Sequence, residues 1–335
     1  MNDSVEIVVK QDNCCGCGSC AVICPNNSIS IQYNCKKGQL YPKITNECFH
    51  CKKCLSVCTG IRADINTLYN NAFDMKEDNL HYNKYFGNYK SINAVSSLSS
   101  DIYNNATSGG AISAIVTYLF NNKIIDSAIV TVFNEAEPLL AQGILINDAR
   151  DVLKSQGSKY CPVHLNTILK DILKEEKISR IGYVGLPCHI SGLRFLQKQI
   201  PALNKKTFIT VGLFCSRTSS LNATKYLLKK MKIKEEEIKS IRYRDGHYPS
   251  NFIINKKNGE IVQIPHLHWR YWGFVFMNFF FQKRCFLCYD KTAELADFSC
   301  GDNWYYSYNL KKGIYSRPRF DKKKGFKMAI LAFSP

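Results

Sequence analysis

Half of the sixteen cysteines in this chain stand near its start, in two copies of one spacing. The first copy is Cys14, Cys17, Cys20 and Cys24, with Pro25 directly after it, and the second copy is Cys48, Cys51, Cys54 and Cys58. In each copy two residues separate successive members of the first three, and three residues precede the fourth. A disulfide framework gives no reason for two copies of the same eleven-residue run. Any fold of this chain must therefore gather these thiols into two compact groups.

This spacing is typical of bacterial ferredoxins, which hold two 4Fe-4S clusters. Three thiolates from one loop bind one cluster, and the fourth cysteine, on the helical turn that follows, reaches the other cluster. We therefore expect Cys58 to complete the first cluster and Cys24 to complete the second. Residues 1–65 are predicted to form an α+β, ferredoxin-like domain with two 4Fe-4S clusters, in which Val5–Val9 and Ile29–Tyr33 are short strands.

The rest of the chain predicts a second, larger domain. With 335 residues, 45% of them hydrophobic, the chain is too long for one ferredoxin. Residues 66–91 are polar and are interpreted as a connector. From residue 92 to 335, strand and helix patterns alternate, which predicts an α/β layered domain with a mostly parallel or mixed sheet. Strands are expected at 126–133, 139–146, 180–184 and 207–214, and helices at 111–121, 160–175 and 189–199.

The positive charge is concentrated outside the N-terminal part. The formal net charge is +18, of which residues 1–100 carry +2 and the remainder +16. A genome rich in Lys and Asn codons explains such a composition, and so does a surface for phosphates or an acidic redox partner. The basic residues do not form a nucleic-acid motif with interleaved aromatic side chains. No apolar run is long enough to span a membrane and no signal peptide is evident, so we expect a protein of the reducing cytoplasm, in an anaerobe.

Two turns of small residues are candidate phosphate sites. They are Thr107-Ser108-Gly109-Gly110 and Gly157-Ser158-Lys159-Tyr160. Each is expected to lead into a helix, whose free N–H groups suit a phosphate, although a purely structural cap is the commoner role. Lys159 adds a positive charge and Tyr160 an aromatic face. No G-x-G-x-x-G follows a strand, so a standard dinucleotide motif is not indicated.

Four further cysteines lie where a metal or redox site would be built. Cys188 falls in the first turn of a predicted helix, where the helix dipole favours a thiolate, and Cys215 ends a predicted strand. Cys285 and Cys288 form a CxxC pair. The four would suffice for a third 4Fe-4S cluster, but a CxxC pair also suits zinc or a redox disulfide, and a lone cysteine is often an inert core residue. The others are interpreted as structural or incidental: Cys15, Cys35, Cys161 and Cys300.

Taken in order, these motifs resemble the beta subunit family of coenzyme F-420-reducing hydrogenases and dehydrogenases. The series is Ser108–Gly110, Gly157–Tyr160, Gly185–His189, Gly212–Cys215, Cys285-x2-Cys288, Ala293–Asp297 and Gly301-Asp302, and it covers nearly the whole chain. The resemblance implies an iron–sulfur flavoprotein oxidoreductase. It implies FAD on the two small-residue turns, with contacts from Ser108, Gly109, Gly110, Gly157, Ser158, Lys159 and Tyr160. It also implies a third cluster on Cys188, Cys215, Cys285 and Cys288, and electron flow from ferredoxin or another redox protein to a small organic acceptor such as coenzyme F-420.

Two departures from the family pattern bear on function. Leu186-Pro187-Cys188-His189 stands where the family has Thr-Pro-Cys-Gln, which makes Cys188 and His189 the candidate catalytic residues. His189 would either shuttle a proton or replace a hydrogen-bonding amide. The chain stops at Pro335, where relatives continue, so a short or C-terminally truncated variant is expected. Two alternative functions are a non-catalytic electron-transfer subunit and a ferredoxin-dependent reductase of another substrate, for example in surface polysaccharide synthesis.

Overall fold

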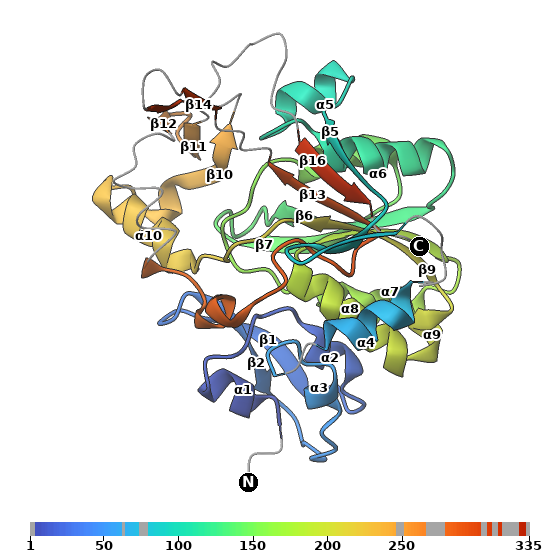
Figure 1. Ribbon diagram of the computed structural model, residues 1–335. Coiled ribbons are helices and arrows are strands. Elements are labelled where there is room, and N and C mark those ends of the chain that lie inside the picture. The colour runs from blue at the N-terminus through green and yellow to red at the C-terminus, as the bar shows by residue number, and fades with distance from the viewer. Residues whose placement is uncertain are drawn as a thin grey trace.

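A seven-stranded mixed sheet forms the centre of the molecule (Figure 1). The structure is a computed structural model, and it describes residues 4–61, 64–73, 80–245, 251–265, 279–302, 307–309, 314–316 and 328–332. Across the sheet the strands are β5 (Ser91–Val95), β16 (Met328–Ala332), β13 (Phe298–Asp302), β9 (Thr207–Leu213), β8 (Arg180–Gly185), β6 (Ser127–Phe133) and β7 (Ala141–Ile146).

Parallel strands occupy the middle of this sheet. β13, β9, β8 and β6 pair in parallel, whereas β16, β5 and β7 are antiparallel to their neighbours. β8 and β9 are in register from Arg180 opposite Thr207 to Gly185 opposite Gly212. Because parallel strands end at the same edge, the residues that follow β8 and β9 emerge side by side. The expected α/β layered architecture with a mixed sheet is therefore confirmed.

Helices cover both faces of the sheet (Figure 1). α6 (Ala111–Asn121) and η1 (Ala149–Ser155) pack on one face, where Ala128 and Val130 point, and the other face, where Ile129 points, carries α4 (Ile65–Ala72), α7 (Leu169–Lys174) and α8 (Pro187–Gln199). The alternation along β6 is that of a strand buried on both sides. α8 begins with Pro187, because proline fits the first helical position, and Cys188 therefore lies in its first turn, as expected.

The N-terminal residues pack against the helices of the second face. They form α1 (Glu6–Lys10), α2 (Ser19–Ile23), the hairpin of β1 (Ile29–Asn34) and β2 (Gln39–Ile44), and α3 (Lys53–Ser56). Asn166 joins the two parts, because its backbone N–H donates to the carbonyl oxygen of Cys17 at 3.0 Å and its Nδ2 donates to Ser19 Oγ at 2.8 Å. Gly192 of α8 permits this approach: a Cβ there would lie 2.3 Å from Ser19 Oγ.

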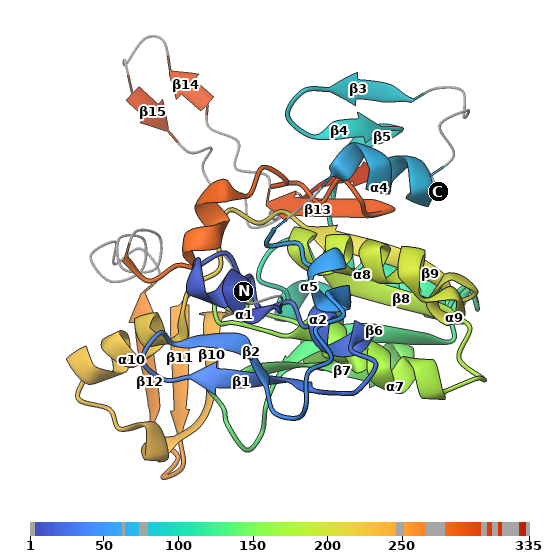
Figure 2. The same ribbon diagram turned by 90° about the horizontal axis from the view of Figure 1, so that it is seen from below.

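A separate antiparallel sheet lies beside the main one (Figure 2). It contains β10 (Ile238–Asp245), β11 (Asn251–Lys256) and β12 (Ile261–Pro265), with α10 (Leu221–Lys230) packed against it through an apolar cluster that includes Leu227, Tyr243 and Phe252. The turn between β1 and β2 reaches α10, where the Leu221 N–H donates to the carbonyl oxygen of Gly38 at 2.8 Å. The remaining elements are α5 (Ser100–Asn105), α9 (Pro201–Asn204), η2 (Leu165–Ile168), η3 (Glu235–Glu237), η5 (Lys283–Leu287) and the hairpins β3 (His81–Asn83)–β4 (Gly87–Tyr89) and β14 (Ser307–Asn309)–β15 (Ile314–Ser316).

Several local predictions were wrong. Val5–Val9 is not a strand; α1 occupies this stretch, and Val5 and Val8, three residues apart, are both buried as on one face of a helix. Residues 160–164 precede any helix because Pro162 disfavours helical backbone at Cys161, and η2 and α7 follow. The helix after Ser108–Gly109 begins where predicted, but its N-cap is Gly110, with φ 75°, and no side chain caps it.

Other expectations concern segments rather than single elements. The polar connector expected at 66–91 contains most of α4, whose Leu68 and Tyr69 are buried, and the β3–β4 hairpin. The turn at Gly157 follows η1 and does not lead directly into a helix. Pro335, where the chain was expected to be cut short, lies outside the described residues. Within the described part of the chain, no helix has both the length and the apolar character needed to cross a membrane.

Candidate functional site

The members of the first predicted cysteine set lie close to one another. Burial raises the pKa of Cys14, and the nearby thiols of Cys17 and Cys58 raise it further. The pKa of Cys20 is raised by burial and then by Cys17, Cys14 and Cys58. These four thiols are therefore mutual neighbours, and they include Cys58, which the crossed spacing assigned to this set. Cys14, Cys20 and Cys58 also share a small apolar cluster with Val8.

The second predicted set is nearer the surface. Burial raises the pKa of Cys54, and Cys48 and Cys51 raise it further. Cys51 is exposed, Cys48 is half-buried, and Cys24 ends α2 and packs against the same apolar cluster as Cys54. The loops at 14–24 and 48–58 thus face each other across this cluster.

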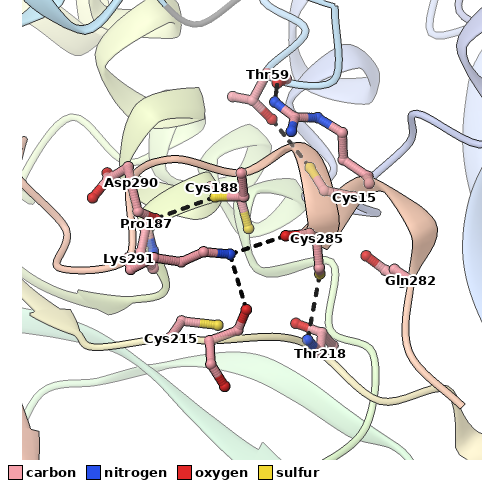
Figure 3. A pocket seen from close by; sticks show the side chains of 13 residues that line it. Cys15, Thr59, Pro187, Cys188, Cys215, Thr218, Gln282, Cys285, Asp290 and Lys291 are labelled. Carbon is pink, nitrogen blue, oxygen red and sulfur yellow. Dashed lines mark hydrogen bonds between the residues drawn. The ribbon is translucent and has the colours of Figure 1, made fainter. Parts of the chain in front are cut away.

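The third predicted set surrounds a cavity of about 50 Å³ between α8, the end of β9 and η5. Cys188 is in the first turn of α8, Cys215 follows β9, Cys285 lies in η5 and Cys288 ends it. Figure 3 shows the thiols of Cys188, Cys215 and Cys285 directed toward one another around Lys291. Burial raises the pKa of Cys215 to about 12, with contributions from Cys285 and Cys288.

Cys15 is a fifth thiol of this cavity, and sequence reasoning missed it. Its Sγ lies 3.1 Å from Thr59 Oγ1, and it lines the cavity together with Cys188 (Figure 3). Thr59 Oγ1 also lies 4.0 Å from Cys17 Sγ. The Cys15 thiol and the Thr59 hydroxyl therefore lie between the first and the third set. The doublet Cys14-Cys15 was the available signal, because adjacent residues of an extended loop point in opposite directions.

The other three cysteines that the sequence left unassigned lie apart from these sets. Cys35 is exposed in the turn after β1. Cys161 and Cys300 are buried among the apolar residues of two different core clusters. These positions suit the structural or incidental roles expected for them.

Backbone and side-chain contacts shape the loop that carries Cys285 and Cys288. Thr218 N–H donates to Cys285 Sγ at 3.4 Å, and Cys288 Sγ donates to the carbonyl oxygen of Asp290 at 3.2 Å. Lys291 Nζ donates to the carbonyl oxygens of Cys285, at 2.9 Å, and Ser216, at 3.0 Å. In the part of the chain that the structure describes, no three His, Cys, Asp or Glu side chains converge as the ligands of a single metal ion do. The thiols of the first set are grouped by being mutual neighbours, and those of the third set by lining one cavity.

His189, a candidate catalytic residue, is turned away from this cavity. Its Nδ1 accepts from the N–H of Leu186 at 3.3 Å, so Nε2 carries the proton and donates to the carbonyl oxygen of Val163 at 3.2 Å. Burial lowers the pKa of His189 to about 4. The ring bridges two backbone groups as an amide side chain would. Cys188, the other candidate, lines the cavity as expected for a ligand.

The two small-residue turns lie next to each other. Ser158 N–H donates to Thr107 Oγ1 at 3.2 Å, which places Ser108–Gly110 beside Gly157–Tyr160. Lys159 does not project from its turn: Nζ donates to the carbonyl oxygens of Ser155, Gln156 and Gly157, and burial lowers the pKa of Lys159 to about 8. The two turns therefore lie side by side, and the Lys159 ammonium is engaged by backbone carbonyl oxygens.

Two arginines of β10, which the sequence did not single out, complete this region. Arg242 Nη2 donates to the carbonyl oxygen of Asn105 at 2.5 Å. Arg244 Nη2 donates to the carbonyl oxygen of Thr107 at 3.3 Å, and its Nη1 pairs with Asp302 at 3.0 Å. Four polar atoms here are buried and have no hydrogen-bond partner in the described structure: Ser108 Oγ, Gln156 Oε1, Arg242 Nε and Arg244 Nε. Three of these can donate, and buried donors without partners are the expected signature of an absent anionic ligand.

Comparison with known proteins gives matches over most of the chain. The family described as coenzyme F420 hydrogenase/dehydrogenase, beta subunit, matches in two parts: the model of its N-terminal part covers residues 94–170, and the model of its C-terminal part covers residues 178–325. The F420-dependent sulfite reductase of Methanocaldococcus jannaschii is 26% identical over 88% of this chain, and the chain spans only 43% of the length of that relative. The coenzyme F420 hydrogenase subunit beta of Methanococcus voltae is 28% identical over 65% of this chain and 76% of its own length.

Two further similarities concern the N-terminal part and the fold. An uncharacterised ferredoxin of Methanocaldococcus jannaschii is 34% identical over 55 residues, which are 16% of this chain and 70% of that protein. A structure of the F420-reducing NiFe hydrogenase complex from Methanosarcina barkeri includes a chain that superposes with a TM-score of 0.56 at 20% identity, over 76% of this chain and 78% of that one. The relatives are named as redox proteins, which supports a redox, electron-transfer role, and the ferredoxin similarity supports iron–sulfur clusters.

Proposed function

The chain belongs to the coenzyme F420 hydrogenase/dehydrogenase beta subunit family, and from that premise we propose that it is an iron–sulfur flavoprotein oxidoreductase. It takes electrons from ferredoxin or another redox protein and reduces an organic acceptor such as coenzyme F-420. The observation that carries this proposal is the junction at Cys15, where the first and third cysteine sets approach each other. A chain that builds two thiol sets this close is organised for electron transfer.

Three 4Fe-4S clusters fit the thiols of this chain. The first would be held by Cys14, Cys17, Cys20 and Cys58, the second by Cys48, Cys51, Cys54 and Cys24, and the third by Cys188, Cys215, Cys285 and Cys288. When bound, such clusters supply one-electron transfer, and FAD supplies the exchange between single electrons and a hydride. Ferredoxin spacing in the first two sets and a shared cavity in the third support this assignment.

The protein's own part is to make thiolates available in a buried place. Burial raises the pKa of the Cys188 and Cys215 thiols, so the free chain keeps them protonated and ligand binding must release protons. The N-terminus of α8 at Cys188 and the Thr218 N–H at Cys285 Sγ offset part of the cost of the negative charge.

The two small-residue turns, together with β10, are the proposed FAD site. The pyrophosphate would meet Ser108 Oγ and the unpartnered Nε atoms of Arg242 and Arg244, with the backbone of Gly109 and Gly157 near the ligand. Gly157 suits this role because its φ of 90° and the space around it leave the backbone exposed to an approaching group. We propose this pairing of turns and arginines in place of the lysine that the sequence suggested.

The acceptor and the donor follow from charge and from the relatives. The sulfite reductase and the hydrogenase subunit named above carry coenzyme F420 in their names, so this deazaflavin is the first acceptor to test. The net charge of +16 outside residues 1–100 favours an acidic donor. Free thiols in such number require a reducing compartment such as the cytoplasm. A non-catalytic electron-transfer subunit is the alternative, and it is favoured by relatives that are named as subunits.

An anaerobic assay separates these two functions. The purified protein is mixed with reduced ferredoxin and coenzyme F-420, and the absorbance of bound flavin and of the acceptor is followed. We expect the protein to contain flavin and to reduce coenzyme F-420. If iron–sulfur absorbance bleaches fully while no flavin is present and no acceptor is reduced, the electron-carrier function is correct instead.

A further inference from the structure

Arg284 lies between the first and the third cysteine set. It belongs to η5 and directly precedes Cys285. Its Nη2 donates to the carbonyl oxygen of Thr59 at 2.9 Å, and Thr59 directly follows Cys58, the last member of the first set. One guanidinium therefore ties together the two segments that carry these sets.

The second terminal nitrogen of this guanidinium makes no hydrogen bond within the described residues. This atom, Nη1 of Arg284, is buried. Arg284 lines the cavity with Cys188 and Cys288. Burial raises the pKa of both Cys58 and Cys288, and the charge of Arg284 opposes that rise at each. A buried cationic donor without a partner is costly unless negative charge is bound beside it.

Neighbouring cations do not share this position. Lys283, one residue earlier, is exposed and its Nζ pairs with Asp12 at 2.8 Å. Lys291 reaches the cavity, but its ammonium donates to two backbone carbonyl oxygens. Arg284 therefore differs from both in having a buried donor without a hydrogen-bond partner in the wall of the cavity that Cys188 and Cys288 also line.

We propose that Arg284 is a shared counter-charge for the first and third cysteine sets, and that it sets the reduction potentials of both clusters together. This inference rests on the proposed function. A reduced cluster carries one more negative charge than an oxidised one, so a fixed cation beside it stabilises the reduced form and raises its potential. Because Arg284 joins the segments that carry both sets, its removal is expected to act on two potentials at once.

The test is a redox titration, followed by electron paramagnetic resonance, of anaerobically prepared full-length protein. Four proteins are compared: the wild type, Arg284→Gln, Arg284→Lys and the matched control Lys283→Gln. A Cys285→Ser protein identifies the signal of the third set. Arg284→Gln is expected to keep its iron and to shift the potentials of the first and third sets to more negative values, with the set of Cys48 unchanged. Arg284→Lys is expected to shift them less, and Lys283→Gln not at all.

Other results of this titration would either overturn or support the role proposed for Arg284. Full iron with no shift, or with a shift of only one potential, would show that Arg284 merely holds Thr59. Equal shifts in Arg284→Gln and Arg284→Lys would also overturn the proposal, as would loss of iron from both. Loss of iron from Arg284→Gln alone would support it, because the charge would then be needed even to assemble the sites. A wild-type protein without iron would overturn the proposed function itself, and this inference with it.

Discussion

At the scale of single residues, some thiols have neighbours that their spacing in the sequence indicates, and others have neighbours that only the fold provides. That Cys58 lies beside Cys14, Cys17 and Cys20 was predictable, because the repeated spacing itself indicates which thiols meet. Cys15 was not predictable, because its role depends on Thr59 and Cys188, which reach it only in the folded chain. The same holds for His189, whose neighbours in sequence suggest chemistry while its contacts in space are with backbone groups.

His189 gives a prediction about pH. Burial lowers the pKa of the folded-state His189 to about 4, below the unfolded value of 6.5. Between these values the unfolded chain takes up a proton that the folded chain refuses, so this residue removes about 1.4 kcal/mol of stability for each pH unit of acidification. We expect the unfolding temperature of the wild type to fall more than that of His189→Gln between about pH 7 and pH 5.

Other groups that titrate between pH 5 and pH 7 are present in both the wild type and His189→Gln, so their effect on stability cancels in the comparison. His189→Gln should retain the hydrogen bonds to Leu186 and Val163, because glutamine offers one acceptor and one donor. Its rate of acceptor reduction should keep the wild-type pH profile. A changed pH profile with an unchanged acid stability would identify His189 as a proton shuttle instead.

At the scale of elements, hydrophobic periodicity predicted the central part of the sheet and two of its helices. Residues 111–121, 127–133 and 180–199 follow the expected pattern because each strand or helix there packs on the core along most of its length. Short elements were harder to predict. α1 has only five residues, and the apolar run of Val5, Ile7, Val8 and Val9 is too short for its period to distinguish a strand from a helix. The β10 strand was not predicted at all, so its two arginines were missed.

The second prediction concerns Arg244 of β10 and the affinity for FAD. Arg244→Gln removes a buried donor from the proposed pyrophosphate site, and a charge-assisted hydrogen bond of about 1.5–3 kcal/mol corresponds to about ten- to a hundredfold weaker FAD binding. Binding is measured by quenching of flavin fluorescence in anaerobic titrations of the flavin-depleted protein. Lys239→Gln, an exposed change on the same strand, should bind FAD normally.

A second control separates charge from folding. Asp302→Asn breaks the ion pair with Arg244 but leaves the cation in place. It should retain most of the FAD affinity. If Asp302→Asn weakens FAD binding as much as Arg244→Gln does, then Arg244 serves the structure of β10 and β13 and not the ligand.

At the scale of the whole molecule, the N-terminal elements α1, α2, α3, β1 and β2 lie on one side of the main sheet (Figure 1). The N-terminal part packs on α8 and η2, and η5 lies against it through Arg284 and Thr59. The parallel strands β8 and β9 end at the edge where Cys188 and Cys215 emerge, which is where α/β sheets commonly place ligands. Sheet topology and the docking of the N-terminal part thus bring together cysteines that are distant in sequence.

The most direct test of the central claim is a count of iron and acid-labile sulfide per chain in three anaerobically reconstituted, full-length proteins. The wild type should contain about twelve irons, as three clusters of four require. Cys285→Ser should contain about eight, because it loses one ligand of the third set while both N-terminal sets remain. Cys15→Ser, which changes a thiol of the same cavity that is not an assigned ligand, should match the wild type. About eight irons in all three proteins would contradict the account, because Cys188, Cys215, Cys285 and Cys288 would then hold no cluster.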